Sequence, residues 1–411
     1  MILPSNDFAA ELTLRLEQIR EQGLYRELRR VDSPQSPHLQ INGKNLLNFS
    51  SNDYLGLANH PALKEAAIRA IERFGSGSGA SRLICGSLAP HHELETALAS
   101  FKKTESALAF SSGYAAAVGT ICALIGKDDV LVLDKLVHAC IIDAAHLSGA
   151  KLRIFSHNDL NELEDILRWS NQRHPTASAS RRSRTLIVTE SVFSMDGDHA
   201  PLREIVQLKE KYGAWLMLDE AHATGILGEN RRGLAEELGV SNEIEIQMGT
   251  LGKALGSAGG YICGPHPLTD ILINRARSFI FSTAPVPAAA AAATAAIHLV
   301  QSAEGRTRRD HLWSLVDGIK TALTQSGWSL PPTRSAIIPL IIGEETRAME
   351  TAAALRDAGT FIPAIRFPTV ARGQARLRLT LTAAHTAEDL LALQSALNAL
   401  PRATEPAQRH A

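Results

Sequence analysis

The chain has 411 residues, of which 45% are hydrophobic, 5% aromatic and 21% charged, and its 42 basic and 43 acidic side chains give a formal charge of −1. At roughly 150 residues per domain, this length predicts two or three folding units that each bury a core. A near-neutral chain without a basic block is a poor candidate for binding nucleic acid or an anionic membrane.

The cysteines and the apolar stretches bear on the cellular compartment. The four cysteines are scattered without a C-x-x-C pair, which argues against a disulfide framework or a zinc ribbon and suits a reducing cytosol. The first residues, MILPSNDFAAELTLRLE, carry acids where a signal peptide needs a basic and then an apolar run. Residues 106–126 and 287–300 are interrupted or too short to span a bilayer. We expect a cytoplasmic protein without a membrane span or a metal site.

Two elements are expected near the N-terminus. Residues 8–22 have apolar side chains at helical spacing, and Gly23 ends this helix. Residues 38–49 contain Asn42-Gly43 between two short apolar runs, which indicates a β-hairpin. We assign residues 1–49 to an N-terminal helix and hairpin segment.

From Pro61 onward, short apolar runs alternate with helical stretches. Helices are expected over residues 61–74, 91–102, 141–147, 160–169 and 201–212. Strands are expected over residues 107–110, 130–133, 152–155, 186–189, 214–218, 244–248 and 260–263. This alternation predicts an α/β fold with a mostly parallel sheet that helices cover on both faces. We assign residues 50–299 to this large domain.

The rhythm changes after Pro287. Helices are expected over residues 287–302, 306–325, 346–358 and 387–400, with Pro401 ending the last one, and strands over 337–342 and 375–381. This pattern predicts a smaller α/β domain, which we assign to residues 300–411.

A buried strand that ends in polar residues is the first candidate for a site. In WLMLDEAHATG (215–225), four apolar residues precede Asp219 and His222. Ligands bind beyond the carboxyl ends of parallel strands, so both side chains are expected to face one. The alternative is an aspartate that caps the next helix with a structural histidine nearby.

The second candidate is Lys253 in GTLGKALGSAGG (249–260), a glycine-rich segment that follows a predicted strand. Glycines let a bulky planar group approach the backbone closely. A partly desolvated lysine with a lowered pKa can form a Schiff base. The alternative is a surface lysine in a loop, and the segment is not a P-loop because Ala254 follows the lysine.

Weaker signals follow other strand ends. Ser112, Gly113 and Tyr114 stand between a short strand and an Ala-rich helix, where backbone N–H groups make an anion site. His138 and the polar segment TESVFSMDGD (189–198) follow two further strands. Each of these patterns is common in structural turns. Together with Asp219 and Lys253 they match a binding site for pyridoxal 5′-phosphate. This cofactor requires a lysine, a carboxylate at its ring nitrogen and hydrogen-bond donors around its phosphate.

Five motifs carry a family resemblance that covers residues 24–400. SNDYLGL (51–57), SGYAAAVG (112–119), ESVFSMDGD (190–198), LDEAHATG (218–225) and GTLGKALG (249–256) resemble signatures of the α-oxoamine synthase family of fold-type I pyridoxal-phosphate enzymes. AIRFPTVARGQARLRLTLTAAH (364–385) resembles the biotin-pathway member of that family, although Phe367 stands where that member more often has proline. ASRLICG (80–86) is written much as in the glycine-using members.

The resemblance implies a role for each matching residue. Lys253 would hold the cofactor and then act as acid and base at the amino-acid Cα, Asp219 would pair with the ring nitrogen, and His138 would stack on the ring. The implied cofactor-binding residues are Ser112, Gly113, Tyr114, Glu190, Ser194, Asp219, His222, Thr250, Lys253, Ser282 and Thr283. Of these, Ser282 and Thr283 would reach the phosphate from the second subunit of a homodimer. The implied substrate-binding residues are His138, Arg366, which would hold the amino-acid carboxylate, and Arg26, Asn52 and Thr369 on the acyl side.

The activity that the resemblance implies is a decarboxylative condensation of L-alanine with a pimeloyl thioester, carried by CoA or by a carrier protein. A sister enzyme that joins glycine to acetyl-CoA or succinyl-CoA is the nearest alternative. An aminotransferase on the same fold belongs to a different reaction class and needs no thioester. A ligand-binding protein without catalysis is the remaining alternative.

Overall fold

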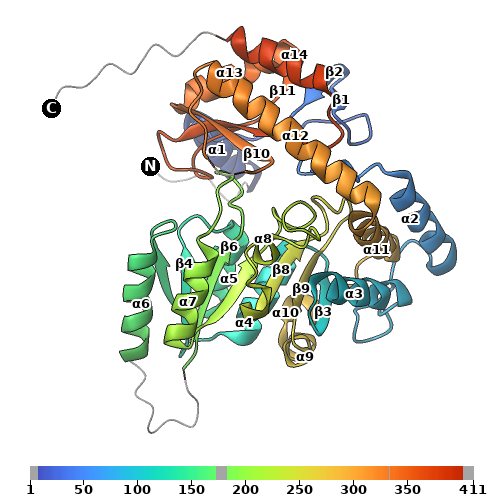
Figure 1. Cartoon of the computed structure of the whole chain (residues 1–411), viewed down its shortest axis with the longest axis vertical. Helices are drawn as coiled ribbons and strands as arrows, with labels where there is room; N and C mark the ends of the chain where they lie inside the picture. The colour runs from blue at the N-terminus through green and yellow to red at the C-terminus, as the bar shows by residue number, and fades with distance from the viewer. Residues whose placement is uncertain (1–7, 173–182, 333, 401–411) are drawn as a thin grey trace.

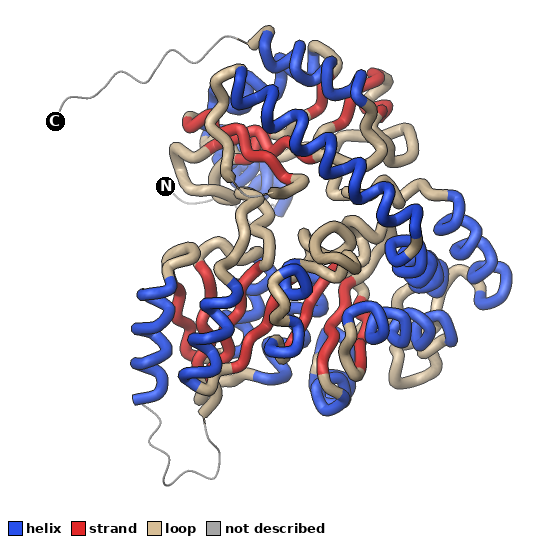
Figure 2. Tube along the Cα trace, in the orientation of Figure 1, coloured by secondary structure: helices blue, strands red, loops and turns tan. Residues whose placement is uncertain are grey.

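The computed structural model describes residues 8–172, 183–332 and 334–400. Its centre is a seven-stranded sheet in the order β3-β9-β8-β7-β6-β4-β5 (Figures 1 and 2). These strands are β3 (Ser106–Phe110), β9 (Gly260–Gly264), β8 (Ile246–Thr250), β7 (Trp215–Asp219), β6 (Thr185–Glu190), β4 (Val130–Asp134) and β5 (Lys151–Phe155). Only β9 runs antiparallel to its neighbours, so the predicted mostly parallel sheet is confirmed within the described residues.

Helices cover both faces of this sheet because its strands are apolar on both sides. Val130 and Val132 of β4 pack into one core cluster, whereas Leu131 and Leu133 pack into the other. One cluster receives the helices α3 (Ala89–Lys102), α6 (Leu160–Gln172), α7 (Leu202–Tyr212) and α11 (Pro287–Gln301). The other receives α4 (Gly113–Leu124), α5 (Ala139–Ser148), α9 (His266–Arg275) and α10 (Arg277–Ile280). Helices α9 and α10 were not predicted from the sequence.

A second, three-stranded antiparallel sheet forms the C-terminal part of the fold. Its strands are β10 (Ile337–Gly343), β13 (Ala375–Thr380) and β12 (Ala364–Ile365), in the order β10-β13-β12. The helices of this part are α12 (Ala303–Gln325), α13 (Glu345–Asp357) and α14 (Ala387–Asn398). The long α12 crosses from α11 of the large domain to the second sheet (Figure 1). Pro401, predicted to stop the last helix, lies outside the described residues.

The N-terminal hairpin is joined to the C-terminal part by strand pairing. The hairpin consists of β1 (His38–Ile41) and β2 (Lys44–Asn48), and β2 pairs in parallel with β11 (Thr360–Phe361). The remaining elements are α1 (Phe8–Glu21), α2 (Pro61–Phe74), α8 (Leu234–Glu237) and the 3₁₀ turn Ser241–Glu243. The domain boundaries near residues 50 and 300 stay predictions. Within the described residues, no helix is both long and apolar enough to cross a membrane.

His157, which follows β5, contacts Asp134 at the end of β4 and Asp198 in the segment after β6. Its Nδ1 lies 3.0 Å from Asp134 Oδ1 and its Nε2 lies 2.7 Å from Asp198 Oδ2. Hydrogen bonds and charge interactions with these two carboxylates outweigh burial and raise the pKa of His157 to about 10. The imidazolium therefore fastens the segment that contains Ser194 to the end of β4.

We expect His157→Ala to lower the free energy of unfolding by about 2–3 kcal/mol at pH 6. An unfolded histidine titrates near 6.5, so the stabilisation is complete below that pH and disappears as the pH rises through about 10. Urea unfolding of both proteins at pH 6 and pH 9.5 measures this loss. The exposed His146→Ala serves as control, and an equal difference at both pH values would contradict the charged pairing.

Candidate active site

The predicted site residues follow the carboxyl ends of neighbouring strands. Ser112 follows β3, Glu190 ends β6, Asp219 ends β7 and Thr250 ends β8. His138 caps α5, which begins five residues after β4 ends. Because β3, β4, β6, β7 and β8 share one direction, these side chains gather along one edge of the sheet, which is where ligands bind in open α/β sheets.

Lys253 and His222 are in direct contact at this edge. Lys253 Nζ lies 3.0 Å from His222 Nε2, and the second ring nitrogen, Nδ1, lies 2.6 Å from the Tyr54 hydroxyl. Burial lowers the pKa of Lys253, while the carboxylates of Asp219 and Glu190 oppose the shift. A lysine with this surrounding has more of the neutral, nucleophilic amine than a surface lysine.

Asp219 is 6% exposed and holds its carboxylate in place through its own loop. Its Oδ1 accepts the Ala221 N–H at 2.9 Å. Burial raises the pKa of Asp219, and the positive charge of Lys253 is the largest effect in the opposite direction. A buried carboxylate of this kind needs a cationic partner, as a protonated pyridine nitrogen is.

Glu190 and His138 are joined across the ends of β6 and β4. Glu190 accepts the His138 backbone N–H at 2.5 Å, and burial together with the Asp219 charge raises the pKa of Glu190 to about 8. Burial and Lys253 lower the pKa of His138, whose Nδ1 accepts the Cys140 N–H at 3.3 Å. A neutral His138 ring is therefore held in one orientation, with Nε2 as its protonated nitrogen.

The N-terminus of α4 forms an anion cradle that suits a phosphate. Gly113 is its first residue, and first-turn N–H groups have no partner within their own helix. A Cβ on Gly113 would lie 2.5 Å from Thr250 Cγ2, so only glycine leaves this approach open. Thr250 Oγ1 is buried and has no hydrogen-bond partner among the described residues. The glycine opening, the unpaired hydroxyl and the buried charged groups Lys253 and Asp219 together fit pyridoxal phosphate.

Gly113→Ala is expected to weaken pyridoxal-phosphate binding about tenfold, or ~1.4 kcal/mol, because the added methyl group collides with Thr250. Titration of the cofactor into the stripped protein, followed by absorbance, gives the dissociation constant. Gly126→Ala is the matched control, since a Cβ at Gly126 has nothing within 4 Å. Equal affinity of the two variants would remove Gly113 from the cradle.

Other predicted residues have contacts outside this cluster. The Tyr114 side chain is 50% exposed and its hydroxyl donates to Asp143 at 2.9 Å. Ser282 and Thr283 lie in the loop after α10, where Thr283 bridges to Ser81. Within the described part of this one chain, no hydrogen bond or ion pair links Ser282 or Thr283 to Lys253.

The predicted substrate residues come from the N-terminal segment and the C-terminal part. Arg366 Nη2 donates to the Tyr25 carbonyl at 3.3 Å, which brings it beside the exposed Arg26. Thr369 is exposed and its N–H donates to the Arg366 carbonyl at 3.0 Å. Asn52 is half-buried. Arg366 therefore contacts the segment that contains Arg26, and its own guanidinium group can bind a carboxylate through two parallel N–H donors.

Arg378 and Tyr54 were not predicted from the sequence as site residues. Arg378 is 5% exposed; its Nε donates to the Ser194 carbonyl at 2.6 Å and its Nη1 donates to Asn52 Oδ1 at 3.1 Å. It thus connects the C-terminal sheet to two segments of the site. Arg378 alternates with leucines in ARLRLT, a pattern that does not by itself indicate a buried charge.

Comparison with known proteins identifies the family. The family profile of aminotransferase class I and II proteins matches residues 44–397. The chain belongs to this family. It is 48% identical to 8-amino-7-oxononanoate synthase of Geobacter sulfurreducens over 375 residues, or 91% of this chain and 94% of that protein. A relative of the same name from Anaeromyxobacter sp. strain K is 46% identical over 393 residues and 96% of both chains.

Solved structures share the fold. A lysine-to-alanine variant of serine palmitoyltransferase from S. paucimobilis, solved with a bound PLP–myriocin aldimine, has a TM-score of 0.88 and 30% identity, and the match covers 96% of this chain and 98% of that chain. The 8-amino-7-oxononanoate synthase of Francisella tularensis has a TM-score of 0.72 and 27% identity and covers 86% and 97%.

These comparisons confirm three predictions made from the sequence. The chain has the fold-type I architecture, depends on pyridoxal phosphate and is an acyltransferase of biotin biosynthesis. The roles of the individual residues and the identity of the substrates stay predictions.

Proposed function

We propose that the chain condenses L-alanine with pimeloyl-CoA or a pimeloyl-carrier protein to give 8-amino-7-oxononanoate, CO₂ and the free thiol. The observation that carries the proposal is the contact between the Lys253 amine and His222, close to the Asp219 carboxylate, in a chain 48% identical to a synthase of that name. In this reaction Cα loses its proton and forms a bond to the thioester carbonyl carbon, while the carbon–sulfur bond breaks and the thiolate takes up a proton. The bond between Cα and the carboxylate then breaks to release CO₂, and Cα takes up a proton in its place.

Pyridoxal phosphate supplies an electron-withdrawing ring that stabilises negative charge at the amino-acid Cα. The Lys253 amine takes the Cα proton and later returns one, a task for which burial has lowered its pKa. Asp219 would keep the ring nitrogen protonated, and the neutral His138 ring would stack on the cofactor. His222 and Ser194 would form hydrogen bonds at the phenolic-oxygen side of the ring.

The remaining residues orient the two substrates. Arg366 holds the alanine carboxylate with its planar guanidinium group, which offers two parallel N–H donors. Arg26, Asn52 and Thr369 line the acyl side. Fixing the carboxylate in one orientation relative to the ring favours loss of CO₂ after the new carbon–carbon bond has formed.

The active unit is a homodimer in which Ser282 and Thr283 of a second copy reach the phosphate. In support of this proposal, the loop around them exposes large apolar side chains that a partner would cover: Phe281 is 71% exposed and Ile84, close to the Ser81–Thr283 bridge, is 78% exposed. The cytoplasmic location expected from the cysteine usage stays a prediction.

Incubation of the purified protein with alanine or glycine and each thioester tests the proposal. Alanine with a pimeloyl thioester is expected to release CO₂ and yield a product with the mass of 8-amino-7-oxononanoate. Turnover of glycine with acetyl-CoA or succinyl-CoA, and none with alanine and pimeloyl thioester, would overturn it. Conversion of the cofactor to its amine form by amino acid alone would instead indicate an aminotransferase.

A further inference from the structure

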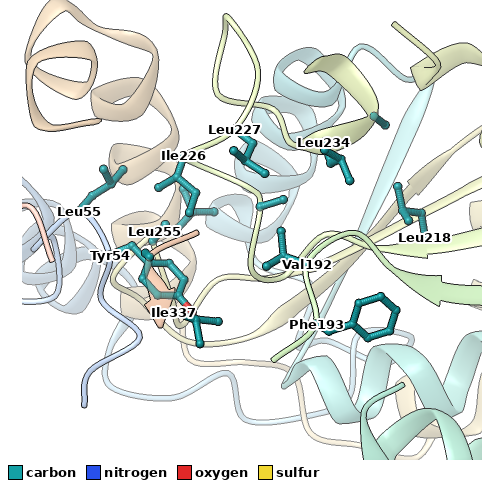
Figure 3. Packing of buried hydrophobic residues seen from close by; sticks show 14 of the residues in the cluster. Tyr54, Leu55, Val192, Phe193, Leu218, Ile226, Leu227, Leu234, Leu255 and Ile337 are labelled. Atoms are coloured by element: carbon teal, nitrogen blue, oxygen red, sulfur yellow. The ribbon is translucent and has the colours of Figure 1, made fainter. Parts of the chain in front are cut away.

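The Tyr54 side chain is the least accessible polar group beside the catalytic lysine. Tyr54 belongs to the segment between β2 and α2 and is 0% exposed. Its ring packs in the core cluster that also contains Leu255 and Ile337, and all three are labelled in Figure 3. A phenol that is buried this completely requires a hydrogen-bond partner at its hydroxyl.

The Tyr54 hydroxyl has two such partners. It lies 2.6 Å from His222 Nδ1 and 3.4 Å from Asn52 Oδ1. His222 Nε2 contacts Lys253 Nζ at 3.0 Å, and Arg378 fixes Asn52 by donating to the same Oδ1 at 3.1 Å. A continuous chain of hydrogen-bonding groups therefore runs from the lysine amine to a guanidinium group on β13.

Two arrangements of hydrogens satisfy this chain. When Lys253 is an ammonium group it donates to Nε2 of a neutral His222, whose Nδ1–H donates to Tyr54, and Tyr54 donates to Asn52. When Lys253 is a neutral amine it can accept from Nε2–H, and the Tyr54 hydroxyl then turns to donate to Nδ1. Only a group that both donates and accepts permits both arrangements.

The charges around the chain keep its middle neutral. Burial raises the pKa of Tyr54 to about 12 and lowers that of His222 far below its usual value. The positive charge of Arg378 acts to lower the pKa of Tyr54, of His222 and of Lys253. The other groups that face His222 or Lys253 are His138, Asp219, Glu190 and Cys140. The group that gains or loses a proton is therefore Lys253. His222 and Tyr54 stay neutral, and only the donor–acceptor direction of their hydrogen bonds reverses.

We propose that Tyr54 is a positioning residue whose hydroxyl lets His222 switch between its two tautomers and so allows the Lys253 amine both to hold and to release a proton. This inference rests on the role of Lys253 in the proposed function. It concerns the chain's own residues and holds before any substrate binds.

Tyr54→Phe removes the only hydroxyl at Nδ1 among the described residues. A buried N–H without an acceptor is costlier than an unpaired ring nitrogen, so His222 will adopt the Nε2–H tautomer in both states of the lysine. In that tautomer Nε2 carries a hydrogen and cannot accept a hydrogen bond from the ammonium form of Lys253. The pKa of Lys253 is therefore expected to fall by about one unit, a tenfold change in its proton affinity.

The pKa of Lys253 can be measured in the full-length, cofactor-stripped protein by trace acetylation with acetic anhydride at a series of pH values. Mass spectrometry of the peptide that contains Lys253 gives the reaction midpoint. Tyr261→Phe is the matched control, because Tyr261 is equally buried but bonds to Thr224 at 3.0 Å, outside this chain of groups. In the holoenzyme, the pH profile of kcat should shift with the same sign while KM for alanine changes less.

A lower midpoint in Tyr54→Phe, with no shift in Tyr261→Phe, supports the inference. Equal midpoints in wild type and Tyr54→Phe overturn it. If Tyr54→Phe does not fold, Asn52→Ala removes the acceptor for the tyrosine hydroxyl and is expected to give a smaller shift of the same sign; an unchanged midpoint there also overturns it. The labelling uses no substrate, so failure to condense alanine with pimeloyl thioester refutes the proposed function separately.

Discussion

A Lys253→Ala variant is expected to fold and retain its quaternary structure, yet to lose the visible absorbance of the bound cofactor and slow product formation by about 10⁴-fold. The substitution removes the amine that contacts His222 and that is under the influence of the Asp219 and Glu190 carboxylates. No other lysine amine has these neighbours among the described residues. Absorbance spectra and CO₂ release with alanine and pimeloyl thioester measure the two losses.

Borohydride reduction of the loaded protein, followed by peptide mass analysis, provides a separate test of the attachment point. The cofactor mass is expected on the peptide that contains Lys253. Lys64→Ala, on the exposed side of α2, is the control and should behave as wild type. Unchanged absorbance and turnover in Lys253→Ala would remove this lysine from its assigned role.

The large sheet could be predicted because parallel strands that are covered on both faces are continuous apolar runs. The run WLML before Asp219 is one of them. Parallel strands also end at a common edge, so the position of Asp219, Thr250 and His138 in the chain was enough to expect them together. Strand ends therefore carried most of the information about the site.

Other parts of the fold have no local signal. Strands β11 and β12 have two residues each, and the pairing of β2 with β11 joins segments about 300 residues apart. Such pairing depends on the packing of the whole molecule and not on the composition of either strand. The association of the N-terminal hairpin with the C-terminal part was for this reason invisible in the sequence.

The missed site residues illustrate the same limit. In ARLRLT the arginines alternate with leucines, a pattern that usually places charged side chains in water. Arg378 is nevertheless buried, because it meets Asn52 across 326 residues of sequence. Tyr54 and His222 are separated by 168 residues. Motif spacing gave the residue types but not these partners.

Asp219→Asn should leave cofactor binding largely intact while slowing exchange of the alanine Cα proton by about 10²–10³-fold. An asparagine has the same shape and its side-chain oxygen can still accept the Ala221 N–H that Asp219 accepts at 2.9 Å. It lacks the negative charge that keeps a ring nitrogen protonated. Incorporation of deuterium from D₂O into alanine, measured without any thioester, isolates this step from carbon–carbon bond formation.

The same substitution has a consequence for Glu190. The Asp219 charge contributes to raising the pKa of Glu190 to about 8, so its removal should move that pKa downward and make Glu190 ionise at lower pH. Asp134→Asn, which alters a buried carboxylate bonded to His157 instead, should change neither the exchange rate nor this titration to a comparable extent. Near-wild-type Cα exchange in Asp219→Asn would mean that the cofactor ring accepts negative charge without an ionised partner at position 219. The assignment of this carboxylate to the ring nitrogen would then be wrong.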